Sequence, residues 1–224
     1  REITSVDLVR ASFERIAEMG EVGALAFTKL YPQEAMEAAR VADQRLMLGD
    51  QAPLLGLPIS IKDSMDVAGE VTPAGSVIFT QNGAAEKDAP VIDAIKRAGA
   101  IIVGRTNMSE FAFSGLGVNP HYGTPVHPER PDYIAGGSTS GGAVSVASQA
   151  VFAALGSDTG GSVRIPAAFC DVVGFKPTAS RISTEGVVPL SYSYDSVGAI
   201  TRSVEDAIVM DQVLSQSDYK VPEI

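Results

Sequence analysis

Residues 136–178 read GGSTSGGAVSVASQAVFAALGSDTGGSVRIPAAFCDVVGFKPT, and they carry the strongest structural signal in the chain. Turns rich in glycine and serine alternate here with segments of small helix-forming residues and with short apolar runs, one of which spans residues 151–155. An apolar run of this length between turn residues is typical of a buried strand. The helix expected at 88–99 is likewise followed by an apolar run at 100–103, and this succession of a helix and a buried strand predicts an α/β architecture in which helices cover a sheet.

The sequence on both sides of this block continues the alternation of helices and strands. Capping residues and apolar side chains at three- and four-residue spacing predict helices, and β-prone runs between glycine and proline predict strands. The elements expected outside the block are helices at 4–19, 32–49 and 88–99, a strand at 59–61 that ends at Lys62, a strand at 100–103 followed by another helix, a long loop at 114–132 and a helix at 203–216. No linker divides the chain, so we expect a single domain over residues 1–224.

The composition excludes several classes of partner and site. The 224 residues carry 17 Lys and Arg against 27 Asp and Glu, a net charge of −10 without a basic cluster, so we expect no direct nucleic-acid binding. The apolar runs are too short for a membrane span, and one cysteine without a secretory leader indicates a cytoplasmic protein. The two histidines, His121 and His127, offer neither a metal site nor a histidine-based triad, so any chemistry depends on other residues.

Two loops rich in glycine and serine, GGSTSGG at 136–142 and GSDTGGSVR at 156–164, are candidate ligand sites. Either loop alone reads as a tight turn, but the second follows an apolar strand, and α/β sheets place ligand sites at strand ends. Neither loop matches GxxxxGK[ST] or GxGxxG, which disfavours a nucleotide site. The alternative is an oxyanion hole for acyl transfer, made by successive backbone N–H groups. Its donors would be Thr159, Gly160, Gly161 and Ser162.

Ser162 and Lys62 are candidates for a nucleophile and its general base. A serine beside oxyanion donors needs a base, and no histidine is placed to supply one. Lys62 ends an apolar run that would bury it, and burial favours the neutral amine that can accept a proton. Asp63 would raise the lysine pKa if the two paired, but adjacent residues of a strand point to opposite faces. An exposed structural pair of Lys62 and Asp63 remains the alternative on these residues alone.

Three separated motifs resemble the amidase signature family. They are GLPISIKD at 56–63, GGSTSGGAVSVA at 136–147 and LGSDTGGSVRIPAAFCDVVGFKPT at 155–178, in the order that the family has them. Supporting segments such as AGAIIVGRTNMSEFAFSG extend the resemblance over almost the whole chain. The resemblance implies a three-layer α/β/α fold around a central mixed sheet. Because members of the family are considerably longer, we expect this chain to lack the C-terminal portion of that fold.

The resemblance also implies a triad of two serines and a lysine. Matched residue by residue, Ser162 is the nucleophile, Ser138 is the bridging serine after a cis Gly137–Ser138 peptide bond, and Lys62 is the base. The resemblance further implies that the reaction needs no metal and no organic cofactor. The positions expected to contact the substrate are Asn107, Met108, Gly137, Thr139 and the loop at 114–127.

Other noticeable residues are expected to be structural or incidental. Asp158 and Arg164 flank the nucleophile, and we expect them to pair around its loop rather than to take part in catalysis. Cys170 lies in the apolar run AAFCDVV, so a buried core residue is expected rather than a nucleophile. The SDYK at 217–220 matches SxxK, but it lacks the companion motifs of that class and is expected to be a chance match.

Taken together, the sequence predicts an amidase that hydrolyses a carbon–nitrogen bond of a small or medium-sized amide through an acyl-enzyme on Ser162. Two alternatives stay open: a glutamine-hydrolysing A-type subunit of an aminoacyl-tRNA amidotransferase, whose partner subunits would contact the RNA, and a non-catalytic assembly subunit of the same fold. The presence of Ser162, Ser138 and Lys62 together favours catalysis. The choice between a homo-oligomer and a partner subunit is left open by the sequence.

Overall fold

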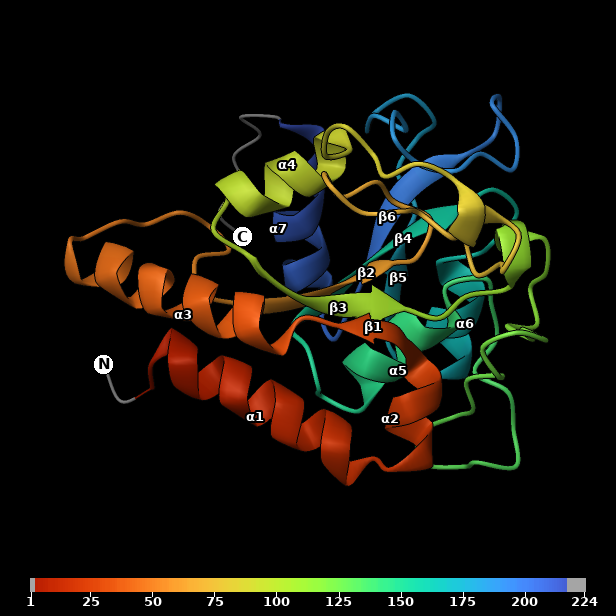
Figure 1. The fold of residues 1–224 in the computed structure, drawn as a ribbon, viewed down its shortest axis with the longest axis horizontal. Coiled ribbons are helices and arrows are strands. Elements are labelled where there is room, and N and C mark those ends of the chain that lie inside the picture. The colour runs from red at the N-terminus through yellow and green to blue at the C-terminus, as the bar shows by residue number, and fades with distance from the viewer. Residues whose placement is uncertain (1–2, 217–224) are drawn as a thin grey trace.

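Six strands form one central sheet within residues 3–216, the part of the chain that the computed structural model describes (Figure 1). The strand order is β1–β3–β2–β4–β6–β5, with parallel pairing among β3, β2 and β4 and antiparallel pairing on both sides of them. The sheet is therefore mixed, as the resemblance implies. The strand bounds are Phe27–Leu30 (β1), Pro58–Lys62 (β2), Ile101–Thr106 (β3), Ala153–Asp158 (β4), Val173–Phe175 (β5) and Ser196–Thr201 (β6).

Helices cover both faces of this sheet (Figure 1). Helices α4 and α7 pack on one face, while α1, α2, α3, α5 and α6 pack on the other, which confirms the three-layer α/β/α fold. No helix within residues 3–216 is long and apolar enough to cross a membrane. The helix bounds are Ser5–Glu18 (α1), Glu21–Ala26 (α2), Pro32–Met47 (α3), Pro90–Arg97 (α4), Ser140–Ala147 (α5), Arg164–Phe169 (α6) and Val204–Ser215 (α7), with 3-10 turns at Phe79–Gln81 and Glu110–Ala112.

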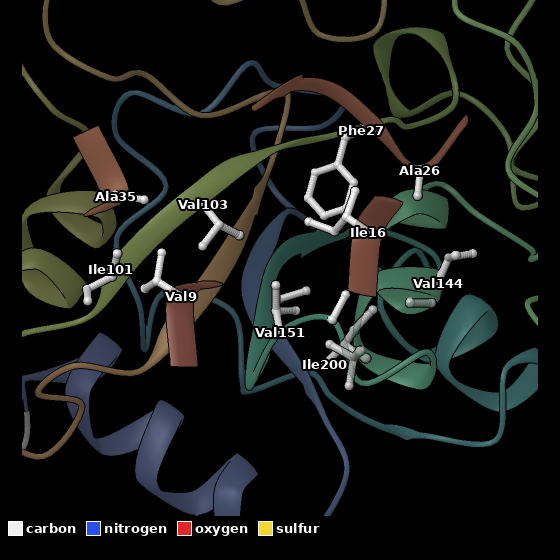
Figure 2. Close-up of a cluster of buried hydrophobic side chains, with 14 of the residues drawn as sticks. Val9, Ile16, Ala26, Phe27, Ala35, Ile101, Val103, Val144, Val151 and Ile200 are labelled. Atoms are coloured by element: carbon white, nitrogen blue, oxygen red, sulfur yellow. The ribbon is translucent and has the colours of Figure 1, made fainter. Parts of the chain in front are cut away.

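Each face of the sheet has its own hydrophobic core. The core beneath α1, α2, α3 and α5 receives Val103, Ala154 and Ile200 from the strands (Figure 2). The core beneath α4 and α7 receives the residues next to these along the strands, such as Leu155 beside Ala154 and Ala199 beside Ile200. Because successive side chains of a strand point to opposite faces, this alternation is what a sheet covered on both sides requires.

Two of the predicted helices begin where the capping pattern indicates. The Thr4 hydroxyl accepts from the Asp7 N–H at 3.1 Å, and the Asp7 carboxylate accepts from the Thr4 N–H at 3.2 Å, which forms a capping box before α1. At the start of α7, the Ser203 hydroxyl accepts from the Asp206 N–H at 3.1 Å. These bonds satisfy N–H groups that have no partner inside the helix, so the local sequence is sufficient to place both starts.

The prediction of a helix directly after the strand at 100–103 is wrong. β3 continues through Thr106, because it pairs with β2 on one side and with β1 on the other. Gly104 permits the approach of β1, since a Cβ there would lie 2.5 Å from the Lys29 carbonyl oxygen. The turn Glu110–Ala112 follows, and positive φ angles of 51° and 60° at its last two residues prevent a longer helix. The short elements α2 and β1 carry no periodic pattern long enough to predict them.

Candidate active site

The candidate catalytic residues meet at the carboxyl ends of the parallel strands. Lys62 is the last residue of β2, and the neighbouring strand β4 ends at Asp158 and leads into the loop that carries Ser162. Ser138 lies in the turn that precedes α5. Open α/β sheets bind their ligands at this edge, so the fold supports the position that the sequence predicts for the site.

Lys62 is fully buried, and its side-chain nitrogen contacts three oxygens. Nζ lies 2.7 Å from Ser138 Oγ, 2.9 Å from Ser157 Oγ and 3.3 Å from the Ser157 carbonyl oxygen. Lys62 is 0% exposed and Asp63 is 1% exposed. The alternative of an exposed structural pair of Lys62 and Asp63 is therefore excluded.

The surroundings of Lys62 favour its neutral form. Burial lowers the pKa of Lys62 to about 7, although the negative charges of Asp158 and Asp195 act in the opposite direction. A lysine with such a pKa is partly a free amine near neutral pH. It can therefore accept a proton, which an ordinary surface lysine cannot do under the same conditions.

Ser138 and Ser162 are brought near each other by their loops. The Gly137–Ser138 peptide bond is cis, as the resemblance implies. The Thr139 N–H donates to the Ser162 carbonyl oxygen at 3.1 Å. Ser138 is 0% exposed, whereas Ser162 is 7% exposed. The expected triad requires two hydrogen bonds, one between Lys62 and Ser138 and one between the two serines. The structure forms the bond between Lys62 and Ser138. Within residues 3–216 no hydrogen bond joins the hydroxyls of Ser138 and Ser162.

Asp158 organises the loop around Ser162. Its carboxylate accepts from the N–H groups of Gly161 at 2.7 Å and Val163 at 3.1 Å, and the Arg164 guanidinium donates to both of its oxygens at 3.0 Å. Burial alone would raise the pKa of Asp158, but Arg164 and the backbone N–H groups lower it below its usual value. The predicted structural pairing of Asp158 with Arg164 is confirmed.

The bond from Gly161 corrects part of the expected oxyanion hole. The sequence predicts that the four N–H groups of residues 159–162 point at one spot, but the Gly161 N–H is directed into its own loop by the Asp158 carboxylate. The N–H groups of Thr159, Gly160 and Ser162 stay predicted donors. Because Asp158 accepts from the N–H groups of Gly161 and Val163, it constrains the loop on both sides of Ser162.

Ser157 and Asp195 lie beside Lys62 in the site, although the sequence analysis predicts no role for either residue. Ser157 supplies the second hydroxyl on Lys62 Nζ, and Asp195 accepts from the Thr159 hydroxyl and from two N–H groups of its own loop. A polar residue inside a buried strand is the signal that could have found Ser157. Asp195 reaches the site because β6 pairs with β4, and no local sequence pattern encodes that pairing.

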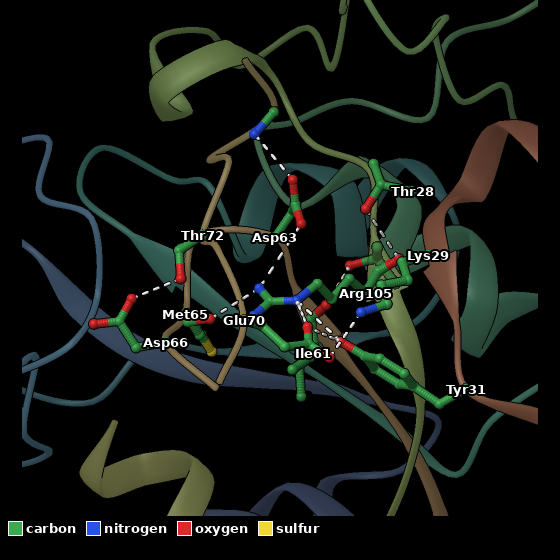
Figure 3. Close-up of polar contacts among 12 residues, drawn as sticks. Thr28, Lys29, Tyr31, Ile61, Asp63, Met65, Asp66, Glu70, Thr72 and Arg105 are labelled. Carbon is green, nitrogen blue, oxygen red and sulfur yellow. Dashed lines mark hydrogen bonds and ion pairs between the residues drawn. The ribbon is translucent and has the colours of Figure 1, made fainter. Parts of the chain in front are cut away.

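A buried ionic network holds the ends of β2 and β3 next to the site (Figure 3). Arg105 is 2% exposed and donates to the Tyr31 hydroxyl and to a Glu70 carboxylate oxygen, both at 3.0 Å, and to the Met65 carbonyl oxygen at 2.9 Å. Asp63 lies 3.8 Å from the guanidinium, and burial raises the pKa of Asp63 to about 6 despite the opposing charge of Arg105. The network joins β3 to segments that follow β1 and β2, so it supports the strand end that carries the base.

The single residues expected to contact the substrate are buried in this structure, whereas much of the loop at 114–127 is exposed or half-buried. Met108 and Thr139 are 0% exposed, and Gly137 is also buried. Asn107 is 0% exposed and uses its side-chain amide to hold carbonyl groups of two other segments at 2.9 Å. The contact of these residues with a substrate stays a prediction.

The remaining candidate residues contribute no chemistry within the described part of the chain. Cys170 is 4% exposed, and burial raises the pKa of its thiol to about 12, which confirms a core residue rather than a nucleophile. Within residues 3–216, no group of three or more His, Cys, Asp or Glu side chains could hold a metal ion. The SDYK match at 217–220 lies outside the described residues.

Known proteins resemble this chain over almost its whole length. The Amidase family model matches residues 7–223. The A-type subunit of Glutamyl-tRNA(Gln) amidotransferase from Desulforapulum autotrophicum is 41% identical over 223 residues, which cover 98% of this chain and 44% of that protein. The chain thus spans about half the length of the curated relatives it matches.

Solved structures agree with the fold as well as with the sequence. A crystal structure described as an amidase has a TM-score of 0.90 and 36% identity, and the match covers 100% of this chain and 51% of that one. The native peptide amidase from Stenotrophomonas maltophilia has a TM-score of 0.89 and 34% identity, and the match covers 97% of this chain and 46% of that one. With a family model matched from residue 7 to residue 223 and two solved amidases that share its fold, the chain belongs to the amidase family.

Proposed function

We propose that this chain hydrolyses an amide bond through an acyl-enzyme on Ser162. The observation that carries the proposal is the 2.7 Å contact between Lys62 Nζ and Ser138 Oγ in a fully buried environment. The neutral Lys62 takes the proton of Ser138 while Ser138 takes the proton of Ser162, whose oxygen attacks the carbonyl carbon. Hydrogen bonds between catalytic groups often tighten when substrate binds, which would close the link between the two serine hydroxyls.

The second half of the reaction reverses the proton relay. The N–H groups of Thr159, Gly160 and Ser162 stabilise the negative oxygen of the tetrahedral intermediate. The proton held by Lys62 then returns through the two hydroxyls to the leaving nitrogen, and the carbon–nitrogen bond breaks. Water that is deprotonated through the same relay attacks the acyl carbon, releases the carboxylic acid and restores Ser162.

The test is the intact mass of the chain after incubation with a fluorophosphonate, which needs no knowledge of the substrate. The expected result is one adduct on the native chain and none on Ser162→Ala or Lys62→Ala, with circular dichroism showing that all three proteins are folded. A folded native chain that gains no adduct overturns the proposal. An adduct that persists in Ser162→Ala would assign the nucleophile to another residue.

A second candidate is glutamine hydrolysis within a larger assembly. The observation that favours it is the name shared by the first relatives, which are A-type subunits of Glutamyl-tRNA(Gln) amidotransferase at 39–42% identity. The acyl group would then be the glutamine side chain, and the ammonia would be passed to a partner protein. Ammonia release from glutamine, compared with release from simple primary amides such as benzamide, separates this candidate from a general amidase.

A further inference from the structure

The Ser157 hydroxyl connects the buried base with a cavity. Lys62 and Ser138 are both 0% exposed, so neither of them contacts solvent directly. The other hydroxyl on Nζ is that of Ser157 at 2.9 Å, and Ser157 lines a cavity of about 220 Å³ whose remaining walls come from the segments 184–189 and 192–197. Neither Ser138 nor Ser162 lines this cavity, so it is separate from the two serines of the proposed relay.

Lys62 acts as a base only when it is neutral, so a protonated Lys62 must first lose its proton to solvent. In amide hydrolysis the relay returns the proton of Lys62 to the leaving nitrogen. In hydrolysis of an activated ester the phenolate departs without a proton, so Lys62 still holds the proton taken from Ser162. It cannot activate water until that proton is lost.

We propose that Ser157 is the proton exit of the base, an inference that rests on the proposed function. The Nζ–H bond of Lys62 breaks as the proton moves to Ser157 Oγ, and the proton of the Ser157 hydroxyl passes at the same time to a water molecule that enters the cavity. Lys62 becomes the neutral amine and Ser157 keeps one proton, so the step is balanced with solvent water as the acceptor.

The charges around the cavity favour outward transfer. Asp195 lies in its wall and acts on the charge of Lys62. Glu185 also lines the wall, but its carboxylate is paired with Lys87 at 2.6 Å. The Asp195 carboxylate lowers the energy of a proton that moves from Lys62 toward the cavity.

The test follows the release of p-nitrophenolate from p-nitrophenyl acetate, in which the burst reports acylation and the steady phase reports turnover. In Ser157→Val we expect a burst of native amplitude and a steady rate lower by roughly tenfold or more. Ser157→Thr, of nearly the same volume but with a hydroxyl, should keep the native steady rate. Imidazole buffer, which is small enough for the cavity, should restore the steady rate of Ser157→Val, whereas the bulkier buffer HEPES at the same pH should not.

Controls separate a proton exit from a structural role. Thr184→Val removes a hydroxyl from the same cavity that does not touch Lys62, and it should leave both phases native. A native steady rate in Ser157→Val overturns the inference, and so does a parallel loss of burst and turnover without rescue by imidazole, because Ser157 would then only position Lys62. If Ser157→Val does not fold, Ser157→Ala replaces it in the same comparison. A native chain that gives neither a burst nor a fluorophosphonate adduct contradicts the proposed function itself.

Discussion

Lys62 and Asp63 are consecutive residues, but they do not pair with each other. Lys62 Nζ lies 2.7 Å from Ser138 Oγ, while an Asp63 carboxylate oxygen accepts from the Gly75 N–H at 3.2 Å and the other lies 3.8 Å from Arg105. The strand geometry that separates adjacent side chains thus keeps a carboxylate from neutralising the lysine. The low pKa of Lys62 follows from this separation, because its burial is not offset by a directly paired anion.

The rate of fluorophosphonate labelling should rise with pH through about 7. The pKa of Lys62 is lowered to about 7 by burial, and only the neutral amine accepts the proton of the nucleophile. We expect Lys62→Met to remove this rise together with most of the labelling. The measurement is the labelling rate by intact mass over a series of pH values. A rise with the same midpoint in Lys62→Met would exclude Lys62 as the titrating group.

Lys62 should also make the stability of the fold depend on pH. Its pKa is about 7 in the folded chain against 10.5 as the ordinary value, so between these values the unfolded chain binds more protons. The free energy of unfolding therefore rises with pH across this window, and below pH 7 the buried ammonium destabilises the fold in full.

Urea unfolding of Lys62→Met checks this sign. The variant lacks the buried amine, so its free energy of unfolding should be higher than that of the native chain. This difference should be largest at pH 6 and smallest at pH 10. The matched control is Lys87→Met, since Lys87 is an exposed residue paired with Glu185 and should show no such trend. A stability difference between Lys62→Met and the native chain that does not change with pH would contradict a titrating buried lysine.

Sequence patterns are sufficient to predict the elements that depend on residues close together in the chain. They do not predict the features that depend on contacts between distant segments. Gly/Ser turns, caps and apolar runs determine β2, β4 and the helices around them, since each depends on residues a few positions apart. The four residues of β1 and the position of Asp195 depend on pairing between strands that are far apart in the chain. The turn at Glu110–Ala112 contains helix-forming residues, and only its tertiary surroundings impose the positive φ angles that end it.

The triad itself illustrates the same division. Lys62 and the loop of Ser162 are recognisable from a buried run and from a glycine-rich turn. Ser138 has no local feature that distinguishes it from an ordinary serine before a helix, and its role comes from the family resemblance. Ser157 is visible as a polar residue in a buried strand, but its partner is known only once β2 and β4 are seen to pair.

Asp158→Asn should damage the nucleophile loop more than Arg164→Gln. Asparagine has one acceptor oxygen where aspartate has two, so it cannot hold the N–H groups of both Gly161 and Val163 as Asp158 does. We expect labelling of Ser162 to slow by roughly tenfold or more, because donors near a reacting oxygen act through their alignment. An unfolding cost of about 1–3 kcal/mol should accompany it.

Arg164→Gln is the matched comparison for that change. The Arg164 side chain is 50% exposed, and its removal leaves the bonds from the loop N–H groups to Asp158 intact. An ion pair that is this open to water contributes at most about 1 kcal/mol. Equal losses of labelling in the two variants would show that the guanidinium, and not the backbone contacts of the carboxylate, orders the loop.

Arg105→Leu should be among the most destabilising single changes near the site. It removes three hydrogen bonds and leaves the Asp63 carboxyl, which is 1% exposed, without its nearest cation. Breaking a buried pair in this way costs about 3–5 kcal/mol. Arg10→Leu is the control, because Arg10 and Asp7 form an exposed pair whose loss should cost no more than about 1 kcal/mol. Urea unfolding at one pH compares the two variants.

A second substitution distinguishes the buried charge from simple loss of packing. The double variant Arg105→Leu/Asp63→Asn has no carboxylate at position 63 that could be left buried and unpaired. It should therefore recover part of the stability that Arg105→Leu alone loses. The recovery should shrink at low pH, because burial already raises the pKa of Asp63 to about 6 and acid neutralises the carboxyl without any substitution. If Asp63→Asn adds its full cost to that of Arg105→Leu at every pH, the two side chains are independent, and the network acts on the end of β2 through Tyr31 and Glu70 instead.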